Sequence, residues 1–340
     1  MALNKTGNKT LIIQNLQGIG DTCWFVRHYH AIAGASASKK VSILTRPRSM
    51  ADQILRYDPS IENVLWLQIK KGDHDGWLGT WRLAQLLKQH QVDSVWILHS
   101  RSLRYALACR LAGIKDIRGP GIGLQKWLLT TPPFLDNLEQ KMHPILRGTK
   151  LLEKHGLFLD ESLPLSVGKT EEQWAKNLLS SLPKPCIGIG LSSSEAHKKW
   201  PWGHYKDLAE MIWKKGGGSF FILGGPQETE EANRLETALK EQSIPCISIT
   251  NQPIAGTLAL IKHLAFVVGN DTGILHAAPQ VGSKGLVLLG RAQVPIHHYG
   301  AVEGIHLDPQ ERVHENSSND MDQLSSQRVF EKITSLGWLF

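Results

Sequence analysis

Short runs of apolar residues recur along the chain, and amphipathic segments of helical length separate them. The runs lie at 11–16, 41–45, 63–69, 94–99, 186–191, 219–225, 246–250, 265–270 and 285–290. Their hydrophobicity is continuous rather than alternating, which is typical of strands buried on both faces. Amphipathic helical patterns lie between them at 81–91, 103–113, 204–216 and 229–242. This alternation predicts an α/β fold with parallel sheets and helices on both faces.

The alternation stops between about residues 119 and 185, where Pro and Gly are frequent and no clear strand pattern occurs. Such a stretch indicates a domain boundary. We therefore predict two Rossmann-like domains, 1–160 and 161–320, that face a cleft. The last helix, within 321–340, is expected to pack back on the first domain.

Length and composition agree with this picture. A chain of 340 residues exceeds what one hydrophobic core usually supports, and 41% hydrophobic with 20% charged residues is ordinary for a soluble enzyme. No apolar run approaches the ~18 residues of a membrane helix, and the polar N-terminus runs into a strand without a cleavage site. We expect a cytoplasmic protein.

Charge and cysteine content narrow the partners. Four scattered cysteines without a CxxC pair argue against a zinc site or a disulfide framework. The net charge of +7 suggests an anionic partner, such as nucleic acid, anionic lipid or a phosphorylated sugar. The basic residues form no long run, and the 11 Trp residues are not interleaved with them, which disfavours RNA.

Ligands of open parallel sheets bind at the carboxyl ends of the strands, so the turns after the apolar runs were considered for chemistry. In the first, NLQGIGDTCWF, Gly18 and Gly20 permit a tight turn, and Asp21 stands where a helix begins. The residue after the next apolar run is not acidic and the third glycine is missing, so a dinucleotide fingerprint is disfavoured. An N-terminal helix cap explains Asp21 equally well.

The second turn, LSSSEAHKKWPWGHY, offers hydroxyl donors on Ser193 and Ser194 and ammonium groups on Lys198 and Lys199. Such groups suit a phosphate, although a solvated polar loop has the same composition.

The third turn, GNDTGILHAAPQVG (269–282), predicts a helix whose N-terminus can hold an anion. The backbone N–H groups of Thr272, Gly273 and Ile274 are expected to be unpaired donors, with the Thr272 hydroxyl beside them. His276 lies three residues further on, where it either faces the same ligand or has a structural role.

Together and in this order, these turns resemble glycosyltransferase family 9, the bacterial lipopolysaccharide heptosyltransferases. The matching stretches are GIGD (18–21), KKWP (198–201), LGGPQE (223–228) and GNDTGILHAA (269–278). The resemblance implies the GT-B architecture and inverting transfer of a heptose from ADP-heptose to the lipopolysaccharide core.

The resemblance also implies roles for single residues. Asp21 matches the catalytic base, Lys198 the lysine near the donor phosphates, and Glu228 the residue that takes the nucleotide ribose. Asp271, Thr272 and Gly273 match the donor-binding turn. With an ammonium group and a helix start beside the diphosphate, neither a metal nor another cofactor is required.

The chain departs from the family at two points. Members commonly carry a basic residue at the end of the first strand and a Pro after the GD pair, and both are missing here. The alternatives are a same-fold transferase with another nucleotide sugar or a protein acceptor, and a non-catalytic nucleotide-sugar-binding protein. For a cytoplasmic protein, the basic surface is compatible with peripheral contact to anionic glycolipid at the inner membrane face.

Overall fold

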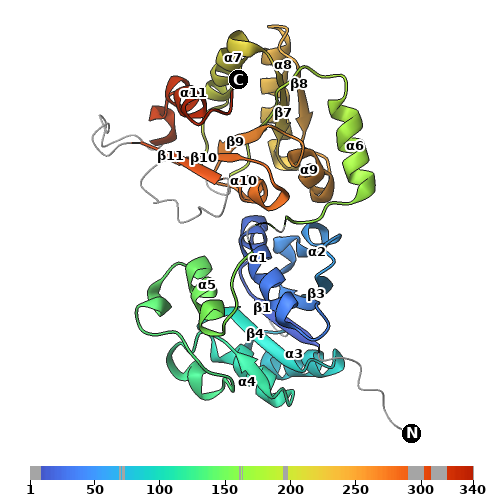
Figure 1. The fold of residues 1–340 in the computed structure, drawn as a ribbon, viewed down its shortest axis with the longest axis vertical. Coiled ribbons are helices and arrows are strands. Elements are labelled where there is room, and N and C mark those ends of the chain that lie inside the picture. Colours follow the sequence, from blue (N-terminus) through green and yellow to red (C-terminus); the bar gives the residue numbers. More distant parts are fainter. Residues whose placement is uncertain are drawn as a thin grey trace. The chain divides into compact units, whose positions relative to one another are not determined.

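A computed structural model describes residues 9–68, 70, 73–160, 162, 164–193, 198–289, 302–307 and 320–339. The chain forms two compact units, Met1–Leu163 and Pro164–Phe340, each built around its own parallel sheet (Figure 1).

The first unit holds a five-stranded sheet in the order β3-β2-β1-β4-β5. Its strands are β1 (Thr10–Gln14), β2 (Val41–Thr45), β3 (Ile61–Trp66), β4 (Ser94–His99) and β5 (Asp116–Arg118). Its helices are α1 (Ile19–Ala35), α2 (Ala51–Ile54), α3 (Gly76–Gln89), α4 (Leu103–Leu111) and α5 (Pro144–Lys154), with short 3₁₀ turns η1 (Pro47–Ser49), η2 (Gly123–Trp127) and η3 (Glu139–Lys141). The strand order reverses between β1 and β4, and such a switch point leaves a crevice at the carboxyl edge of the sheet.

The second unit holds a six-stranded sheet in the order β11-β10-β9-β6-β7-β8. Its strands are β6 (Cys186–Gly190), β7 (Ser219–Leu223), β8 (Cys246–Ile249), β9 (Phe266–Asn270), β10 (Gly285–Leu289) and β11 (Val302–His306). Its helices are α6 (Lys169–Leu179), α7 (Trp202–Gly216), α8 (Thr229–Lys240), α9 (Ile254–Ile261), α10 (Gly273–Ala277) and α11 (Ser326–Ser335), with η5 (Pro226–Glu228), η6 (Pro279–Val281) and η8 (Asp320–Gln323). Here the order reverses between β6 and β9, so the turns after these strands share the switch point.

All nine apolar runs contain a strand, and every strand pairing is parallel, which confirms the predicted α/β class. The prediction missed β5 and β11. Both are edge strands with polar residues, DIR and VEGIH, and an edge strand does not need the continuous hydrophobicity of a central one.

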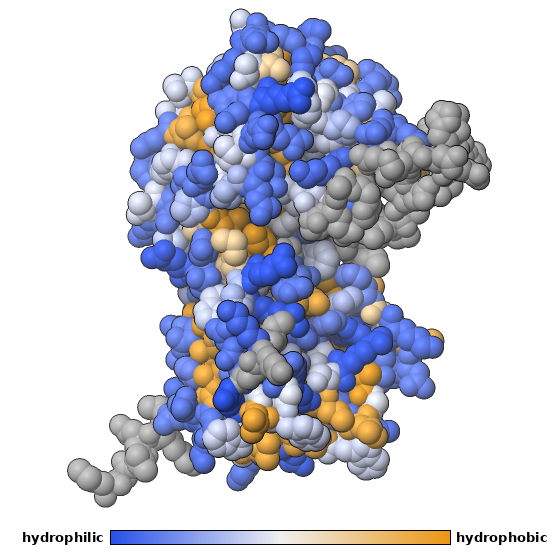
Figure 2. Space-filling model, turned by 180° about the vertical axis from the view of Figure 1, so that it is seen from behind, coloured by the Kyte–Doolittle hydropathy of each residue, from blue (hydrophilic) through white to orange (hydrophobic). Residues whose placement is uncertain are grey.

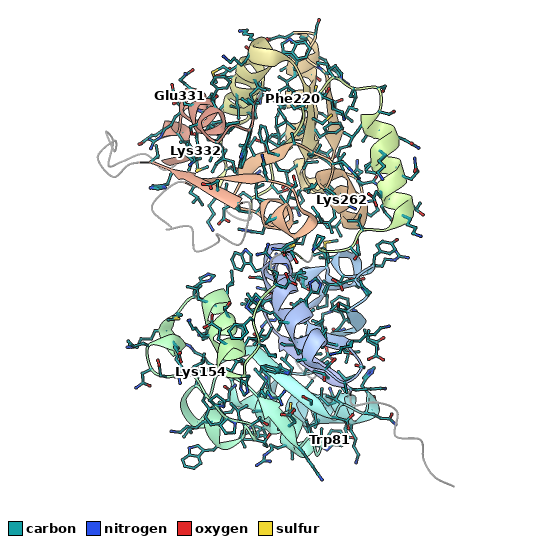
Figure 3. All side chains as sticks on the ribbon, viewed as in Figure 1. Trp81, Lys154, Phe220, Lys262, Glu331 and Lys332 are labelled. Carbon is teal, nitrogen blue, oxygen red and sulfur yellow. The ribbon has the colours of Figure 1, made fainter. Side chains whose placement is uncertain are left out.

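The C-terminal helix belongs to the core of the second unit. Val329 and Ile333 of α11 are fully buried there, and the helix packs beside α7. The same core contains Phe220 of β7, which is labelled in Figure 3. Every third or fourth position of α11 is apolar, and this stripe completes the helical layer over the second sheet.

Among the described helices, none is both long and apolar enough to span a membrane.

Candidate functional site

The carboxyl ends of β6 and β9 are tied together by Asn270, a residue that the sequence analysis did not single out. Its side chain is 1% exposed. The Oδ1 atom accepts hydrogen bonds from the Trp200 backbone N–H (2.8 Å) and the Tyr205 hydroxyl (3.0 Å), and Nδ2 donates to the Leu191 carbonyl (2.8 Å). Asn270 therefore holds the turn after β6 and the KKWP stretch against the end of β9.

Glycines allow these strand ends to approach each other. Gly190 and Gly269 are register partners, and a Cβ atom on Gly269 would lie 2.3 Å from the Gly190 carbonyl oxygen. Only a residue without a side chain fits there, which explains the Gly before Asn270. The sequence shows Gly269 directly before Asn270, but the close approach of Gly269 to Gly190 depends on the register of the sheet.

Asp271 joins two of the predicted site residues. Its Oδ1 is 2.9 Å from His276 Nε2, and its Oδ2 is 3.7 Å from Lys198 Nζ. An ionised carboxylate only accepts hydrogen bonds, so His276 donates from Nε2. His276 is 5% exposed. Asp271 thus fixes the orientation of the imidazole and holds the ammonium group at the switch point of the second unit.

The helix start after Asp271 differs in part from the prediction. The Thr272 hydroxyl caps α10 by accepting from the Ile274 N–H at 3.2 Å, so that N–H is not an unpaired donor. Helix α10 has only five residues, and its dipole is correspondingly small. What remains at this turn is the Thr272 hydroxyl proton and the backbone N–H groups of Thr272 and Gly273 as candidate donors to an anion.

Glu228 lies at the end of η5, in the turn after β7. Its Oε2 accepts from the Gly225 N–H (2.8 Å) and from the Ser192 hydroxyl (3.2 Å). The first bond satisfies the N–H at the start of η5, a structural role that a carboxylate three residues into a helix often takes. The second bond links the turn after β7 to the turn after β6. Glu228 is therefore brought to the same edge as Asp271 and Lys198.

The serine loop is described only in part. Ser193 follows β6 at this edge, whereas Ser194 lies outside the described residues. The two adjacent lysines have different carboxylate partners. The ammonium group of Lys198 lies near Asp271, whereas that of Lys199 pairs with Glu231 of α8 at 3.5 Å. Trp200 is fully buried and donates from Nε1 to the Leu324 carbonyl (2.7 Å), so it anchors the loop to the C-terminal segment.

In the first unit, Asp21 stands in the first turn of α1. Its Oδ2 accepts from the Gly18 backbone N–H at 2.8 Å and so caps the start of α1. The Gly18–Gly20 turn and Asp21 therefore lie together at the carboxyl end of β1, as predicted from their spacing. The capping bond fixes the carboxylate near the switch point, and it agrees with a structural role as well as with a catalytic one.

A group of two arginines and two histidines at the same edge was not predicted. His99 ends β4, Arg101 follows it, and α5 contributes Arg147 near its N-terminal cap His143. Burial first, and then the positive charges of Arg147 and His143, lower the pKa of His99 to about 4. Arg147 is 4% exposed, and its pKa is lowered by burial and by Arg101. Among the described residues, no carboxylate forms a salt bridge with Arg147. Because these residues lie far apart in sequence, no local motif revealed them.

Groups of three or more His, Cys, Asp or Glu side chains able to hold a metal ion are not found among the described residues.

Comparisons with known proteins place this architecture in a family. The family model described as "Glycosyltransferase family 9 (heptosyltransferase)" matches residues 80–297. The lipopolysaccharide heptosyltransferase 1 of Escherichia coli K12 is 22% identical over 301 residues, covering 84% of this chain and 87% of that protein.

Two solved structures share the fold. The family 9 glycosyl transferase from Veillonella parvula is 18% identical with a TM-score of 0.76, covering 96% of this chain and 97% of that one. An E. coli heptosyltransferase with ADP-2-deoxy-2-fluoro heptose is 16% identical with a TM-score of 0.68, covering 96% and 99%. The match to the family model covers more than half of the chain, which therefore belongs to glycosyltransferase family 9, the heptosyltransferase family.

Proposed function

We propose that this glycosyltransferase moves a heptose from ADP-heptose to a lipopolysaccharide core acceptor, with inversion at the anomeric carbon. The observation that carries the proposal is the family match over 80–297, which includes the turns after β4, β6, β7 and β9. The acceptor class is supported by the similarity to a protein named lipopolysaccharide heptosyltransferase 1. The donor class is supported by the similarity to a structure with an ADP-heptose analogue.

The second unit would hold the donor. The Lys198 ammonium group, the Thr272 hydroxyl and the Gly273 N–H suit the diphosphate, because they combine a positive charge with hydrogen-bond donors. Asp271 is itself negative and would repel a phosphate, so we assign it a positioning role: it holds Lys198 and His276. Glu228 uses Oε2 for capping, and we assign its Oε1 to accept from the ribose hydroxyls.

The first unit would hold the acceptor and the base. The Asp21 carboxylate takes the proton of the acceptor hydroxyl while that oxygen attacks the anomeric carbon. The bond from this carbon to the diphosphate breaks, and the electron pair leaves with ADP, whose charge Lys198 stabilises. The cations around Arg147 suit the anionic groups of the acceptor.

Replacement of Asp21 tests the base. Asp21→Asn keeps an oxygen that can accept from the Gly18 N–H, so the helix cap and the unfolding midpoint should change little. Transfer, followed by release of nucleoside diphosphate, should fall by ~10²–10⁴-fold, the usual contribution of a general base. ADP binding should persist. If the variant keeps more than a tenth of the activity, Asp21 is a cap and not the base.

Two adjacent lysines offer a matched pair for the donor site. Lys198→Ala should weaken ADP binding by roughly 10–100-fold, the worth of one charge-assisted hydrogen bond. Lys199→Ala removes an ammonium group that pairs with Glu231 and should leave ADP binding unchanged. Calorimetry with ADP, UDP and GDP measures both effects. Tighter binding of UDP or GDP than of ADP would contradict the ADP-heptose assignment, and ADP binding without any transfer activity would indicate a non-catalytic protein.

A further inference from the structure

One helical layer of the first unit exposes large apolar side chains on its outer face. Helices α3 and α4 pack side by side on the sheet through Leu83, Ala84 and Leu87 of α3, and η2 follows against α4. On the opposite side of α3, Trp77 is 85%, Leu78 72% and Trp81 57% exposed. Figure 3 labels Trp81 on the surface, and Figure 2 shows hydrophobic surface on this unit.

This exposure is concentrated in one place. Seven of the ten exposed large apolar residues among those described belong to the three neighbouring elements α3, α4 and η2, and we call their exposed surface the α3–α4–η2 face: Trp77, Leu78, Trp81, Leu103, Leu111, Leu124 and Trp127. The other exposed large apolar residues among those described, Leu138, Leu146 and Phe158, also belong to the first unit. Single exposed apolar residues need no explanation, but a group of them on one layer marks an interaction surface.

The charge of the chain follows the same division. The first unit has 22 Lys and Arg against 13 Asp and Glu, whereas the second has 16 against 18, so the basic excess belongs to the first unit alone. The segment 76–127 that contains the layer has eight basic and two acidic residues. Arg82, Lys88, Arg110 and Lys126 are exposed on its helices. Asp75, directly before the segment, is paired with Arg104.

Two of the Trp residues on this face have a basic neighbour in the chain. Arg82 is the next residue after Trp81, and Lys126 lies over the Trp127 ring with its Nζ 5.7 Å from the centroid. Tryptophan is enriched at the boundary between lipid tails and headgroups, and basic residues beside it meet anionic headgroups. Trp and Arg also occur at protein interfaces, but an excess of eight basic over two acidic residues in this segment suits a uniformly anionic surface. The charge therefore favours an anionic bilayer over a protein partner.

We propose that the α3–α4–η2 face docks on an anionic membrane surface, with the Trp and Leu side chains at the level of the headgroups and the Arg and Lys side chains on lipid phosphates. The docking rests on the proposed function in one respect: a glycolipid acceptor is held in a membrane, and the acceptor-binding unit must reach it there. The structural basis of the face is independent of the reaction.

Vesicle sedimentation tests the proposal with the full-length protein. Binding is measured to phosphatidylcholine vesicles with 30 mol% phosphatidylglycerol and to pure phosphatidylcholine vesicles, at low and at moderate salt. The double variant Trp77→Gln/Trp81→Gln should bind the anionic vesicles at least tenfold more weakly. Arg82→Gln/Lys126→Gln should lose roughly fivefold per charge and show a weaker salt dependence, since each basic residue near an anionic surface contributes ~1 kcal/mol. Phe158→Gln, an equally exposed site outside the face, should bind like wild type.

Three results would overturn the proposal. The first is unchanged binding of the double Trp variant to anionic vesicles, and the second is equal wild-type binding to the two vesicle types. The third is a wild-type dimer in solution that the Trp variant converts to a monomer, because the face would then join two copies of the chain.

A transfer assay separates this proposal from the proposed function. The double Trp variant should transfer normally to a soluble acceptor fragment without lipid chains, and less to an acceptor in vesicles. Equal loss with both acceptors would contradict membrane docking. Vesicle binding through this face by a protein without transfer activity would support docking and refute the proposed function.

Discussion

Asn270 connects three stretches of the second unit, and its truncation gives the sharpest test of how the candidate site is held. In Asn270→Ala the three side-chain hydrogen bonds are lost. The Trp200 N–H and the Leu191 carbonyl are left inside the protein without the partner that the structure gives them. The Tyr205 hydroxyl is less affected, because the Gly190 carbonyl lies 3.2 Å away as a second acceptor.

The expected cost follows from these two groups. A buried polar group that loses its partner costs about 1–3 kcal/mol, so two of them cost about 4 kcal/mol. This is a large share of the ~5–15 kcal/mol by which a typical domain is stable. With a urea m-value of about 2 kcal/mol/M, the unfolding midpoint of the second unit should fall by about 2 M.

Urea unfolding followed by hydrogen-exchange mass spectrometry reports the two units separately. Tyr205→Phe is the control: it removes a hydroxyl, but Asn270 Oδ1 keeps the Trp200 N–H, so the loss should stay near 1 kcal/mol. ADP binding should also weaken in Asn270→Ala, because the stretch that carries Lys198 is released. A midpoint within about 0.5 M of wild type, or a Tyr205→Phe variant as unstable as Asn270→Ala, would refute the reasoning.

Further expectations concern packing and pH. Gly269→Ala places a methyl group against the Gly190 carbonyl and should prevent folding of the second unit. Gly203→Ala, in open space on α7, should be neutral or stabilising. Soluble yield and thermal unfolding of the two variants measure the difference. Ile333→Ala should destabilise the second unit by about 2–4 kcal/mol and leave exchange in the first unit unchanged; the opposite pattern would return α11 to the first unit. Burial lowers the pKa of His28 to about 3, so the unfolded chain binds more protons below pH 6.5 and stability is lost as the pH falls. At pH 5 the loss is about 2 kcal/mol, and His28→Gln should flatten this part of the urea-midpoint profile; an unchanged profile would exclude His28 as its cause.

Much of the candidate site could be located from local sequence. Gly18 and Asp21, and likewise Glu228 and Thr272, stand directly after apolar runs, where the chain has to turn at the carboxyl edge of a parallel sheet. Their mutual arrangement within a turn depends on residues three or four positions apart. The capping bonds of Asp21 and Glu228 are of this kind.

Contacts between residues far apart in sequence could not be predicted from local patterns. Asn270 reads in the sequence as one more polar turn residue, yet it bonds to Leu191, 79 positions away. The buried Arg147 influences the half-buried His99 only because α5 packs on β4. The positions of the edge strand β11 and of α11 likewise depend on tertiary packing. Each covers a part of the second unit that the other elements leave exposed.

The fold class, the turns that carry polar groups and the family resemblance could all be read from the order of the residues, because hydrophobic periodicity and short motifs are local properties of the chain. Three features became visible only in the folded protein: Asp271 lies between Lys198 and His276, the Ile274 N–H is already capped, and three exposed Trp residues belong to one basic layer. These features arise when strand register and helix packing bring distant residues together, and the free energy of that packing is shared over the whole unit.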